Sequence, residues 1–234
     1  QGQVNLGAIT SPGLMLLPPA VALVKAEHPS LRVSLQIETS DVLMDRLGHG
    51  KLDIVVARLF AQHDKRELRY EVISEETVCA ITRPGHPLLR APALGLADLS
   101  GAGWIVPPAG SVLRHRFELA FQEQGVPVPV DLTETSALLF VTKMLQQSDM
   151  VAVVSIDVAR YYAAHGIVAM LPIQLPWRMD AFGIVTRTDR LLSPAAQLML
   201  RALKTAALAV YGHSVDTVVA EPATIDGSVI AKTA

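Results

Sequence analysis

The residues Glu38-Thr39-Ser40, followed after twelve residues by Asp53-Ile54-Val55, have a counterpart 96 residues later in Glu134-Thr135-Ser136 and Asp149-Met150-Val151. An alternating apolar pattern typical of a strand precedes each Glu-Thr-Ser, and a helical pattern follows it. A short apolar run follows each aspartate. Strand, helix and buried strand in this order form a parallel α/β unit, and serine is a common N-cap of the helix. The repeat therefore predicts an α/β fold with two similar lobes.

Each copy of the repeat predicts elements with definite bounds. A three-residue match alone could arise by chance, but the agreement of the flanking patterns and of the aspartate spacing favours a structural duplication. The predicted elements are strand 31–38, helix 41–49 and strand 53–57 in the first copy, and strand 128–133, helix 136–147 and strand 150–154 in the second. Their helices are expected to pack through Leu43, Met44 and Leu47, and through Leu139, Phe140 and Met144, respectively.

The rest of the chain predicts how the lobes are connected. A long strand over 70–82 forms the first crossing, and 172–177, leading into strand 182–185, forms the second. The predicted domains are lobe I at 4–82 plus 178–212, lobe II at 83–177, and a flexible or vector-derived tail at 213–234. Near the start, Pro18-Pro19 either begin the helix proper or kink its first turn.

Composition limits the classes of function. The chain has 234 residues, 50% of them apolar, and a net charge of −2, and no apolar run reaches the length of a membrane span. No basic patch of the kind that grips nucleic acid is visible. Cys79 is the single cysteine and is predicted to be a small buried strand residue, and the seven histidines show no ligand pair. We therefore expect no disulfide, metal or cofactor.

Hydroxyl side chains follow the strands of both lobes at the predicted helix starts. Helix N-termini at the carboxyl ends of parallel strands offer unpaired N–H groups that suit oxygen-rich ligands. The candidate ligand-binding residues of this kind are Thr10, Ser11, Ser40, Ser111, Thr135, Ser136 and, less directly, Ser155, and Gly110 is included as the neighbour of Ser111. The alternative role for each is ordinary helix capping. Their position at the same edge of both sheets favours a small anionic or polyhydroxy ligand held between the lobes.

Three charged residues allow two interpretations. Arg58 follows strand 53–57, where it could pair with an anionic ligand or lie solvated in a loop. Glu38 and Glu134 could form a catalytic carboxylate pair, but we expect them to end their strands at the cleft wall or to face solvent. No catalytic residue is assigned.

A series of short motifs in fixed order resembles one family. They are Val4-Asn5-Leu6-Gly7-Ala8-Ile9, Leu17-Pro18, His28-Pro29, Ser40-x-x-Leu43-x-x-x-Leu47-x-x-Gly50-x-Leu52-Asp53, His86-Pro87-Leu88, Leu96-x-Asp98-Leu99 and Gly110-Ser111-x-x-Arg114. Together, over about 4–212, they are similar to the effector-binding domain of a LysR-type transcriptional regulator. Gly7-Ala8-Ile9 and Ala57-Arg58-Leu59 resemble the branch that senses sugars and aromatic-degradation intermediates.

The resemblance implies a fold, partners and a location. The family has the type 2 periplasmic-binding-protein fold, with two Rossmann-like lobes, two crossover strands and a ligand in the cleft. Its members are cytoplasmic and carry an N-terminal winged helix-turn-helix, which this chain lacks, so we expect a regulatory fragment that does not itself bind promoter DNA. A homodimer is expected, with helix 12–27 and strand 31–37 meeting helix 111–124 and strand 128–133 of the partner, and a tetramer in the full-length protein.

Other functions remain open at this point. A periplasmic solute-binding protein of a transport system shares the fold, and a helix-turn-helix or a signal peptide upstream would distinguish the two. An enzyme is disfavoured because no nucleophile–base pair or metal motif is visible.

Overall fold

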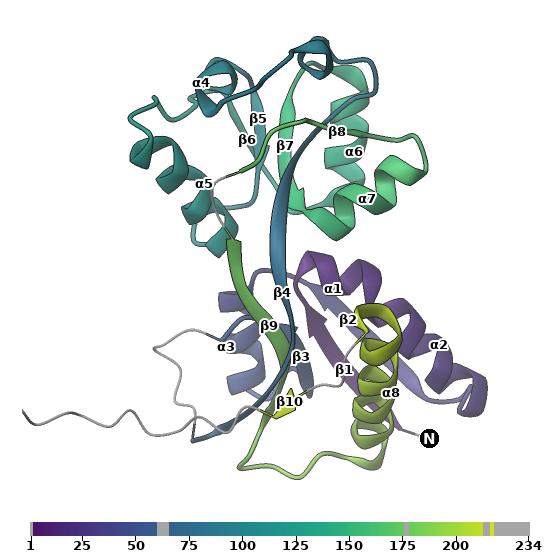
Figure 1. The fold of residues 1–234 in the computed structure, drawn as a ribbon. Helices are drawn as coiled ribbons and strands as arrows, with labels where there is room; N and C mark the ends of the chain where they lie inside the picture. Colours follow the sequence, from purple (N-terminus) through teal and green to yellow (C-terminus); the bar gives the residue numbers. More distant parts are fainter. Residues whose placement is uncertain (1, 60–65, 176–177, 213–215, 218–234) are drawn as a thin grey trace, which may run out of the picture.

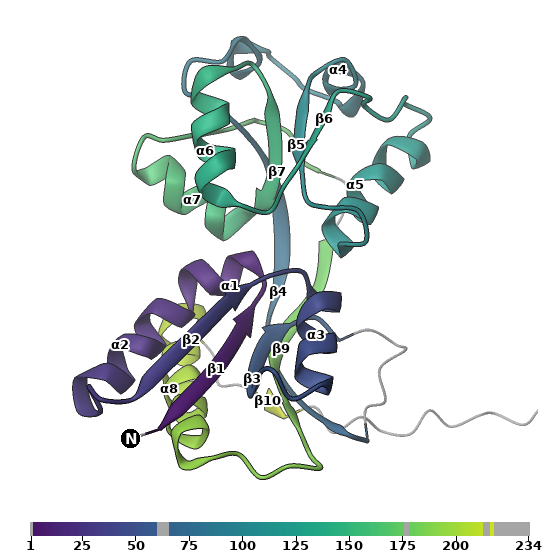
Figure 2. The ribbon, with the colours of Figure 1, turned by 180° about the vertical axis from the view of Figure 1, so that it is seen from behind.

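The computed structural model describes residues 2–59, 66–175, 178–212 and 216–217. They form two α/β lobes, one above the other in Figures 1 and 2, which two long strands connect. These strands are β4 (Leu68–Thr82) and β9 (Arg178–Arg187), and they pair antiparallel with each other. The predicted fold class, two Rossmann-like lobes joined by two crossover strands, is confirmed.

Lobe I is built on parallel strands with helices on both faces. β1 (Gln3–Ala8) lies between β2 (Arg32–Ile37) and β3 (Ile54–Ala57), and β9 adds to β3 in the antiparallel direction. The helices are α1 (Thr10–Met15), α2 (Leu17–Glu27), α3 (Ser40–Gly48) and α8 (Pro194–Tyr211). Helices α2 and α8 pack together on one face, and α3 covers the other (Figures 1 and 2). Pro18 and Pro19 stand in the first turn of α2, so the helix proper begins beside them, as one alternative predicted.

Lobe II repeats this arrangement. Its strands are β5 (Trp104–Val106), β6 (Leu132–Glu134), β7 (Val151–Ser155) and β8 (Ala169–Met170), and its helices are α4 (Leu96–Leu99), α5 (Val112–Glu123), α6 (Leu138–Gln147), α7 (Ile156–Ala164) and the short 3₁₀ turn Pro87–Arg90. Side chains alternate between two cores because successive strand residues point to opposite faces. Trp104 packs edge-on against Phe117 of α5, whereas its neighbour Ile105 packs with α6 and α7.

The strand β4 belongs to the sheets of both lobes. Up to Thr77 it pairs with β9, and from Val78 to Ile81 it pairs with β7. The strand order is therefore continuous, β2-β1-β3-β9-β4-β7-β5-β6, with β8 and β10 (Asp216–Thr217) also paired to β4. The boundaries at 82/83 and 177/178 stay predictions, because β4 is shared. Apart from β10, the predicted tail lies outside the described residues.

The second copy of the repeat departs from its prediction at three points. Strand β6 begins only at Leu132, and Val130, expected within a strand, is 95% exposed. Helix α6 begins at Leu138, two residues later than predicted. Leu139 and Phe140 are exposed, because the sheet-facing positions of α6 are Val141 and Leu145, and a helix turns by about 100° per residue. The first copy packs through Leu43, Met44 and Leu47 as predicted.

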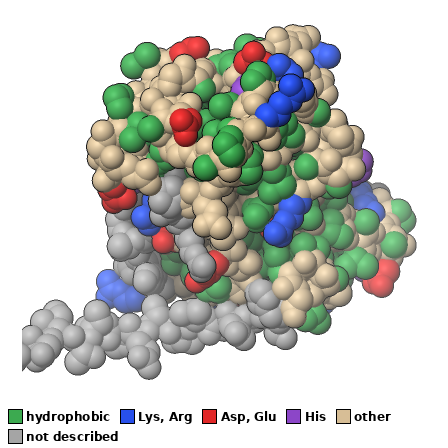
Figure 3. Space-filling model, turned by 45° about the horizontal axis from the view of Figure 1, so that its top comes forward, with side chains coloured by type: hydrophobic (Ala, Val, Ile, Leu, Met, Phe, Trp, Pro, Cys, Tyr) green, Lys and Arg blue, Asp and Glu red, His purple; other side chains and the backbone are tan. Residues whose placement is uncertain are grey.

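The surface mixes charges of both signs. On the face in Figure 3, acidic and basic side chains occur in small separate groups among apolar and polar ones. The net charge of the chain is −2. Neither sign forms an extended area among the described residues of this face.

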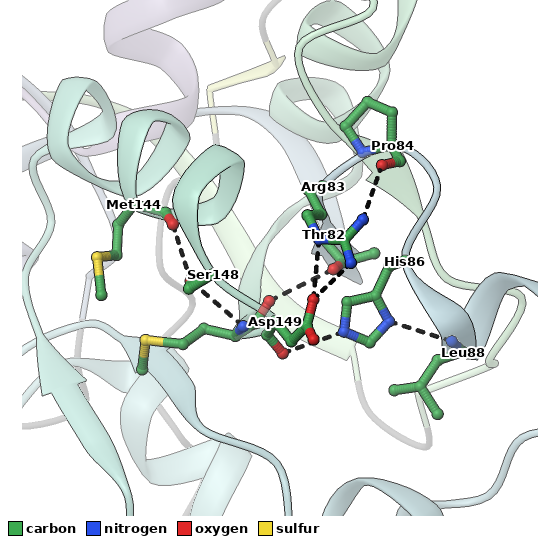
Figure 4. Close-up of polar contacts among 9 residues, drawn as sticks. Thr82, Arg83, Pro84, His86, Leu88, Met144, Ser148 and Asp149 are labelled. Carbon is green, nitrogen blue, oxygen red and sulfur yellow. Dashed lines mark hydrogen bonds and ion pairs between the residues drawn. The ribbon is translucent and has the colours of Figure 1, made fainter.

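The two repeated aspartates hold the entries of their strands. The Asp53 carboxylate accepts a hydrogen bond from the Asn5 backbone N–H at 2.7 Å. Asp149 accepts one from Arg83 Nε at 2.8 Å, and its carbonyl oxygen lies 3.0 Å from His86 Nε2 (Figure 4). His86 Nδ1 accepts the Leu88 N–H at 3.1 Å, so Nε2 carries the proton and donates to Asp149. In both lobes the aspartate ties the start of a buried strand to a neighbouring segment.

One glycine of β9 permits the close approach of the crossover strands. A Cβ on Gly183 would lie 2.8 Å from the backbone carbonyl carbon of Glu71. We expect Gly183→Ala to lower the free energy of unfolding by about 1–3 kcal/mol, because the backbone of β4 cannot move without disturbing both lobes. Urea denaturation measures this change. Gly48→Ala is the matched control, since nothing lies within 4 Å of its Cβ; an equal loss in both variants would contradict the explanation.

Candidate ligand-binding site

A pocket lies where the two lobes meet. Its walls include eight of the nine predicted ligand-binding residues: Thr10, Ser11, Ser40, Arg58, Ser111, Thr135, Ser136 and Ser155. Gly110 is not in the wall, but its loop approaches lobe I, since a Cβ on Gly110 would lie 3.9 Å from Asp41 Oδ2 of α3. The cavity measures about 110 Å³. A water occupies roughly 10–15 Å³ of such a volume, so the pocket suits a small molecule.

The prediction that the candidate hydroxyl side chains of lobe I cap helices is wrong. Ile9 and Thr39 hold the N-cap positions of α1 and α3, and neither helix has a side-chain cap. Ser40 is the first residue of α3, and its Oγ accepts the buried backbone N–H of Arg58 at 3.0 Å. Ser11 Oγ is buried and has no hydrogen-bond partner among the described residues. Ser40 thus links α3 to the end of β3, whereas the Ser11 hydroxyl is left without a partner in the described part of the chain.

The hydroxyls of lobe II are divided between capping and other contacts. Ser111 caps α5 by accepting the Arg114 N–H at 3.0 Å, and Ser155 caps α7 by accepting the Val158 N–H at 3.4 Å. The predicted cap of α6 is wrong, because Ala137 occupies that position and Thr135 Oγ1 accepts its N–H at 3.1 Å. Ser136 stands before the helix, and its hydroxyl has no partner in the part of the chain that the structure describes.

Arg58 is neither a solvated loop residue nor a free cation. It is 7% exposed, its guanidinium forms an ion pair with Glu76, and its Nε donates to the Asp180 carbonyl at 3.0 Å. Burial lowers the pKa of Arg58 to about 10, an effect that nearby Asp180 partly opposes. The group is therefore charged at neutral pH, and Glu76 already balances that charge.

Glu76 lines the pocket, and the sequence reasoning missed it. A signal was present in the strand alternation. In the alternation of β4, Glu76 falls on the same face as Val78 and Ala80, which are buried in the core, while Glu75 and Thr77 are exposed. A carboxylate on the buried face of a strand requires a partner, because an isolated buried charge is costly.

The two glutamates of the repeat lie in different surroundings. Glu38 lines the pocket and lies 3.6 Å from Arg46, whereas Glu134 is outside the lining and lies 3.0 Å from Arg114. Among the described residues no cluster of metal-ligating side chains occurs. Cys79 is buried as predicted, and burial raises the pKa of its thiol to about 11.

The remaining wall of the pocket is mostly apolar: Ile9, Ile105, Val106, Pro107, Val112, Leu113, Leu138, Val141, Ala152, Val153, Val154, Val158 and Met179.

Comparison with known families identifies the domain. The family described as "LysR substrate binding domain" matches residues 1–208. The chain belongs to this family. The resemblance in the sequence motifs is thereby confirmed.

Curated relatives of this LysR domain are regulators. The chain is 35% identical over 206 residues to the HTH-type transcriptional regulator GbpR of Azospirillum brasilense, covering 88% of this chain and 60% of that protein. It is 31% identical over 204 residues to the HTH-type transcriptional regulator GalR of Pseudomonas putida, covering 87% and 51%. The chain thus spans little more than half the length of these relatives.

Solved structures show the same fold. The effector-binding domain of QuiR in complex with shikimate matches with a TM-score of 0.71 and 16% identity, over 92% of this chain and all of that one. The regulatory domain of Synechocystis CcmR in complex with 2-PG matches with a TM-score of 0.72 and 19% identity, over 88% and 98%. At these identities the likeness concerns the fold alone. Because the relatives are regulators, a transport receptor is not favoured.

Two serines of the pocket should differ in their effect on stability. Ser40→Ala removes the acceptor of a buried N–H, so we expect the free energy of unfolding to fall by about 1–3 kcal/mol. Ser136→Ala removes no described hydrogen bond, and its effect should stay within about 0.5 kcal/mol. Chemical denaturation of the two variants compares them. Equal stability would mean that the Ser40 contact with Arg58 does not hold α3 in place.

Proposed function

We propose that this chain is the effector-sensing domain of a LysR-type transcriptional regulator, and that a small ligand binds between its lobes. The observation that carries the proposal is the pocket, where hydroxyl side chains from both lobes meet around a small cavity. A ligand that touches both lobes binds one lobe arrangement better than another. Such differential binding shifts the population toward the favoured arrangement.

The strand β4 offers the path for that change. Its pairing passes from β9 to β7 beside Glu76, Met179 and Ser155, which line the pocket. A ligand bound there stands at the junction of the two sheets. Small rotations at this point alter the relation of one lobe to the other, and we propose that this change is transmitted to the rest of the regulator.

We infer that DNA is contacted by a part of the regulator outside this chain. The face in Figure 3 has no extended basic area, and the names of the relatives describe HTH-type regulators that are longer than the chain. No helix in the described ranges is long and apolar enough to cross a bilayer. The proposed site of action is the cytoplasm, and no catalytic step or cofactor is proposed.

We further propose that the domain forms a homodimer, and a tetramer in the full-length regulator. The two ends of the sheet order are β2 and β6, so each has an open edge among the described strands. Apolar side chains are exposed beside both edges: Leu23 on α2, Leu35 and Ile37 on β2, and Val130 before β6. In the antiparallel dimer, α2 and β2 of each subunit contact the α5 and β6 region of the other subunit. The same contact therefore occurs twice, as in an isologous interface, and it covers these apolar residues.

The ligand should stabilise the domain. At a ligand concentration about 100 times the Kd, binding to the folded state alone adds about 2.7 kcal/mol. For a chain of this size we expect the melting temperature to rise by roughly 5–10 °C. A thermal-shift screen with sugars, aromatic acids and aliphatic diacids tests this. Ser136→Ala should weaken the binding of any hit, and a hit unaffected by Ser136→Ala and Ser40→Ala would bind elsewhere.

The dimer should depend on the β2 edge. Leu35→Lys introduces a charge at a half-exposed apolar position of that edge, so we expect the variant to shift toward monomer. Light scattering coupled to size exclusion, at tens of micromolar, measures the mass. Leu191→Lys is the control, because Leu191 is 99% exposed and belongs to the segment between β9 and α8, not to an edge strand. A wild-type domain that is strictly monomeric would exclude the interface.

A further inference from the structure

Two polar atoms of pocket residues lack a hydrogen-bond partner among the described residues. They are the Ser11 hydroxyl oxygen and Oε1 of Glu76. Both residues are more than nine-tenths buried, Ser11 at 3% and Glu76 at 7% exposure. Buried polar atoms of folded proteins are nearly always paired, and an exception calls for an explanation. A third such atom, the Tyr211 hydroxyl, belongs to a residue outside the pocket lining, which packs on Phe182.

The second oxygen of Glu76 is already in use. Oε2 forms the ion pair with Arg58, whose Nε is occupied by the Asp180 carbonyl. The pair is therefore close to neutral as a unit. What it still lacks is a donor for Oε1, because a carboxylate is an acceptor at both oxygens.

The charges around the pocket disfavour an anionic ligand. The charged residues that the structure describes in its lining are Glu38, Arg58 and Glu76, two acids and one base. Glu38 lies beside Arg46, and Arg114, next to the Ser111 cap, is bound to both Glu118 and Glu134. Each of these arginines is thus balanced by a carboxylate of the protein. Among the described residues of the pocket wall, a carboxylate ligand would bring a further negative charge close to Glu76 without an unmatched cation to receive it.

We propose that the pocket binds a small neutral polyol, and that Glu76 Oε1 accepts a hydrogen bond from one of its hydroxyl groups while Ser11 bonds another. The inference rests on the proposed function and names the ligand class of the same site. A hydroxyl group donates and accepts, so it satisfies a carboxylate oxygen and a serine hydroxyl alike. The apolar wall, with Ile9, Ile105 and Met179 among its members, suits the C–H groups of such a ligand.

Matched sugars test the charge preference. The probes are D-glucose and D-galactose, the hexuronates and hexosamines of the same configurations, and myo-inositol, with benzoate and shikimate as carboxylates of other shape. Thermal shift ranks them, and calorimetry gives the Kd of each hit. We expect at least one neutral compound to bind at least roughly ten-fold more tightly than its uronate and its amine.

Two variants assign the binding to the proposed residues. Glu76→Gln removes the negative charge, so the ligand loses a hydrogen bond to a charged acceptor and Arg58 loses its counter-charge. We therefore expect the affinity for the neutral hit to fall roughly 10- to 100-fold and the preference to move toward the uronate. Glu75→Gln is the matched control, the same change at the exposed neighbour on β4. Ser11→Ala removes no hydrogen bond of the described fold and should weaken the hit roughly five- to ten-fold. Circular dichroism verifies that each variant is folded.

The outcomes separate the inference from the proposed function. Tighter binding of uronates, benzoate or shikimate by the wild-type domain overturns the polyol class and leaves effector sensing in place. An unchanged affinity of the neutral hit in folded Glu76→Gln overturns the role of Glu76. If Glu76→Gln fails to fold, Ser11→Ala decides, and an unchanged affinity there overturns the proposal. If none of the probes shifts the melting temperature, the proposed function fails as well.

Discussion

The backbone ladder of β4 is the constraint on which the rest of the structure depends. One continuous strand supplies hydrogen bonds to β9 as far as Thr77 and to β7 from Val78 onward, so the two sheets share a single backbone. The close passage at Gly183 follows from this sharing, as does the position of the pocket beside the change of partner. Because the lobes meet at a strand and not at a flexible linker, their relative orientation is tied to the geometry of a few paired residues.

The pocket combines an apolar wall with polar groups that are mostly committed. Ser40 serves the Arg58 N–H, Ser111 and Ser155 cap helices, and Arg58 is held by Glu76 and by the Asp180 carbonyl. Such commitments keep the side chains in place before any ligand arrives, which reduces the ordering cost of binding. The pocket groups left without a partner among the described residues include an acceptor on Glu76 and the hydroxyls of Ser11 and Ser136. In the binding proposed above, these groups decide which ligand the site accepts.

Much of the fold follows from local patterns, whereas the details of the site do not. The repeated Glu-Thr-Ser and Asp motifs predict both α/β units, and the hydroxyls at the strand ends gather around one pocket as expected. A shift of two residues at the start of α6 moves Ser136 off the cap, and the burial of Val141 and Leu145 leaves Leu139 on the exposed face. The pairing of Arg58, just after β3, with Glu76 of β4 connects two strands that are consecutive in the sequence but separated in the sheet by β9. No local periodicity encodes such a contact. Capping and ion pairing depend on tertiary geometry, which amino-acid composition and residue spacing do not determine.

The burial of Cys79 has a practical consequence for measuring how the lobes move. Its thiol is shielded in β4 and stays protonated well above neutral pH, so it reacts slowly with maleimides and other thiol reagents. A cysteine introduced on the surface of each lobe is then the preferred point of attachment for a fluorophore or a spin label. Distances between the lobes become measurable in solution without replacing any residue of the strand that joins them.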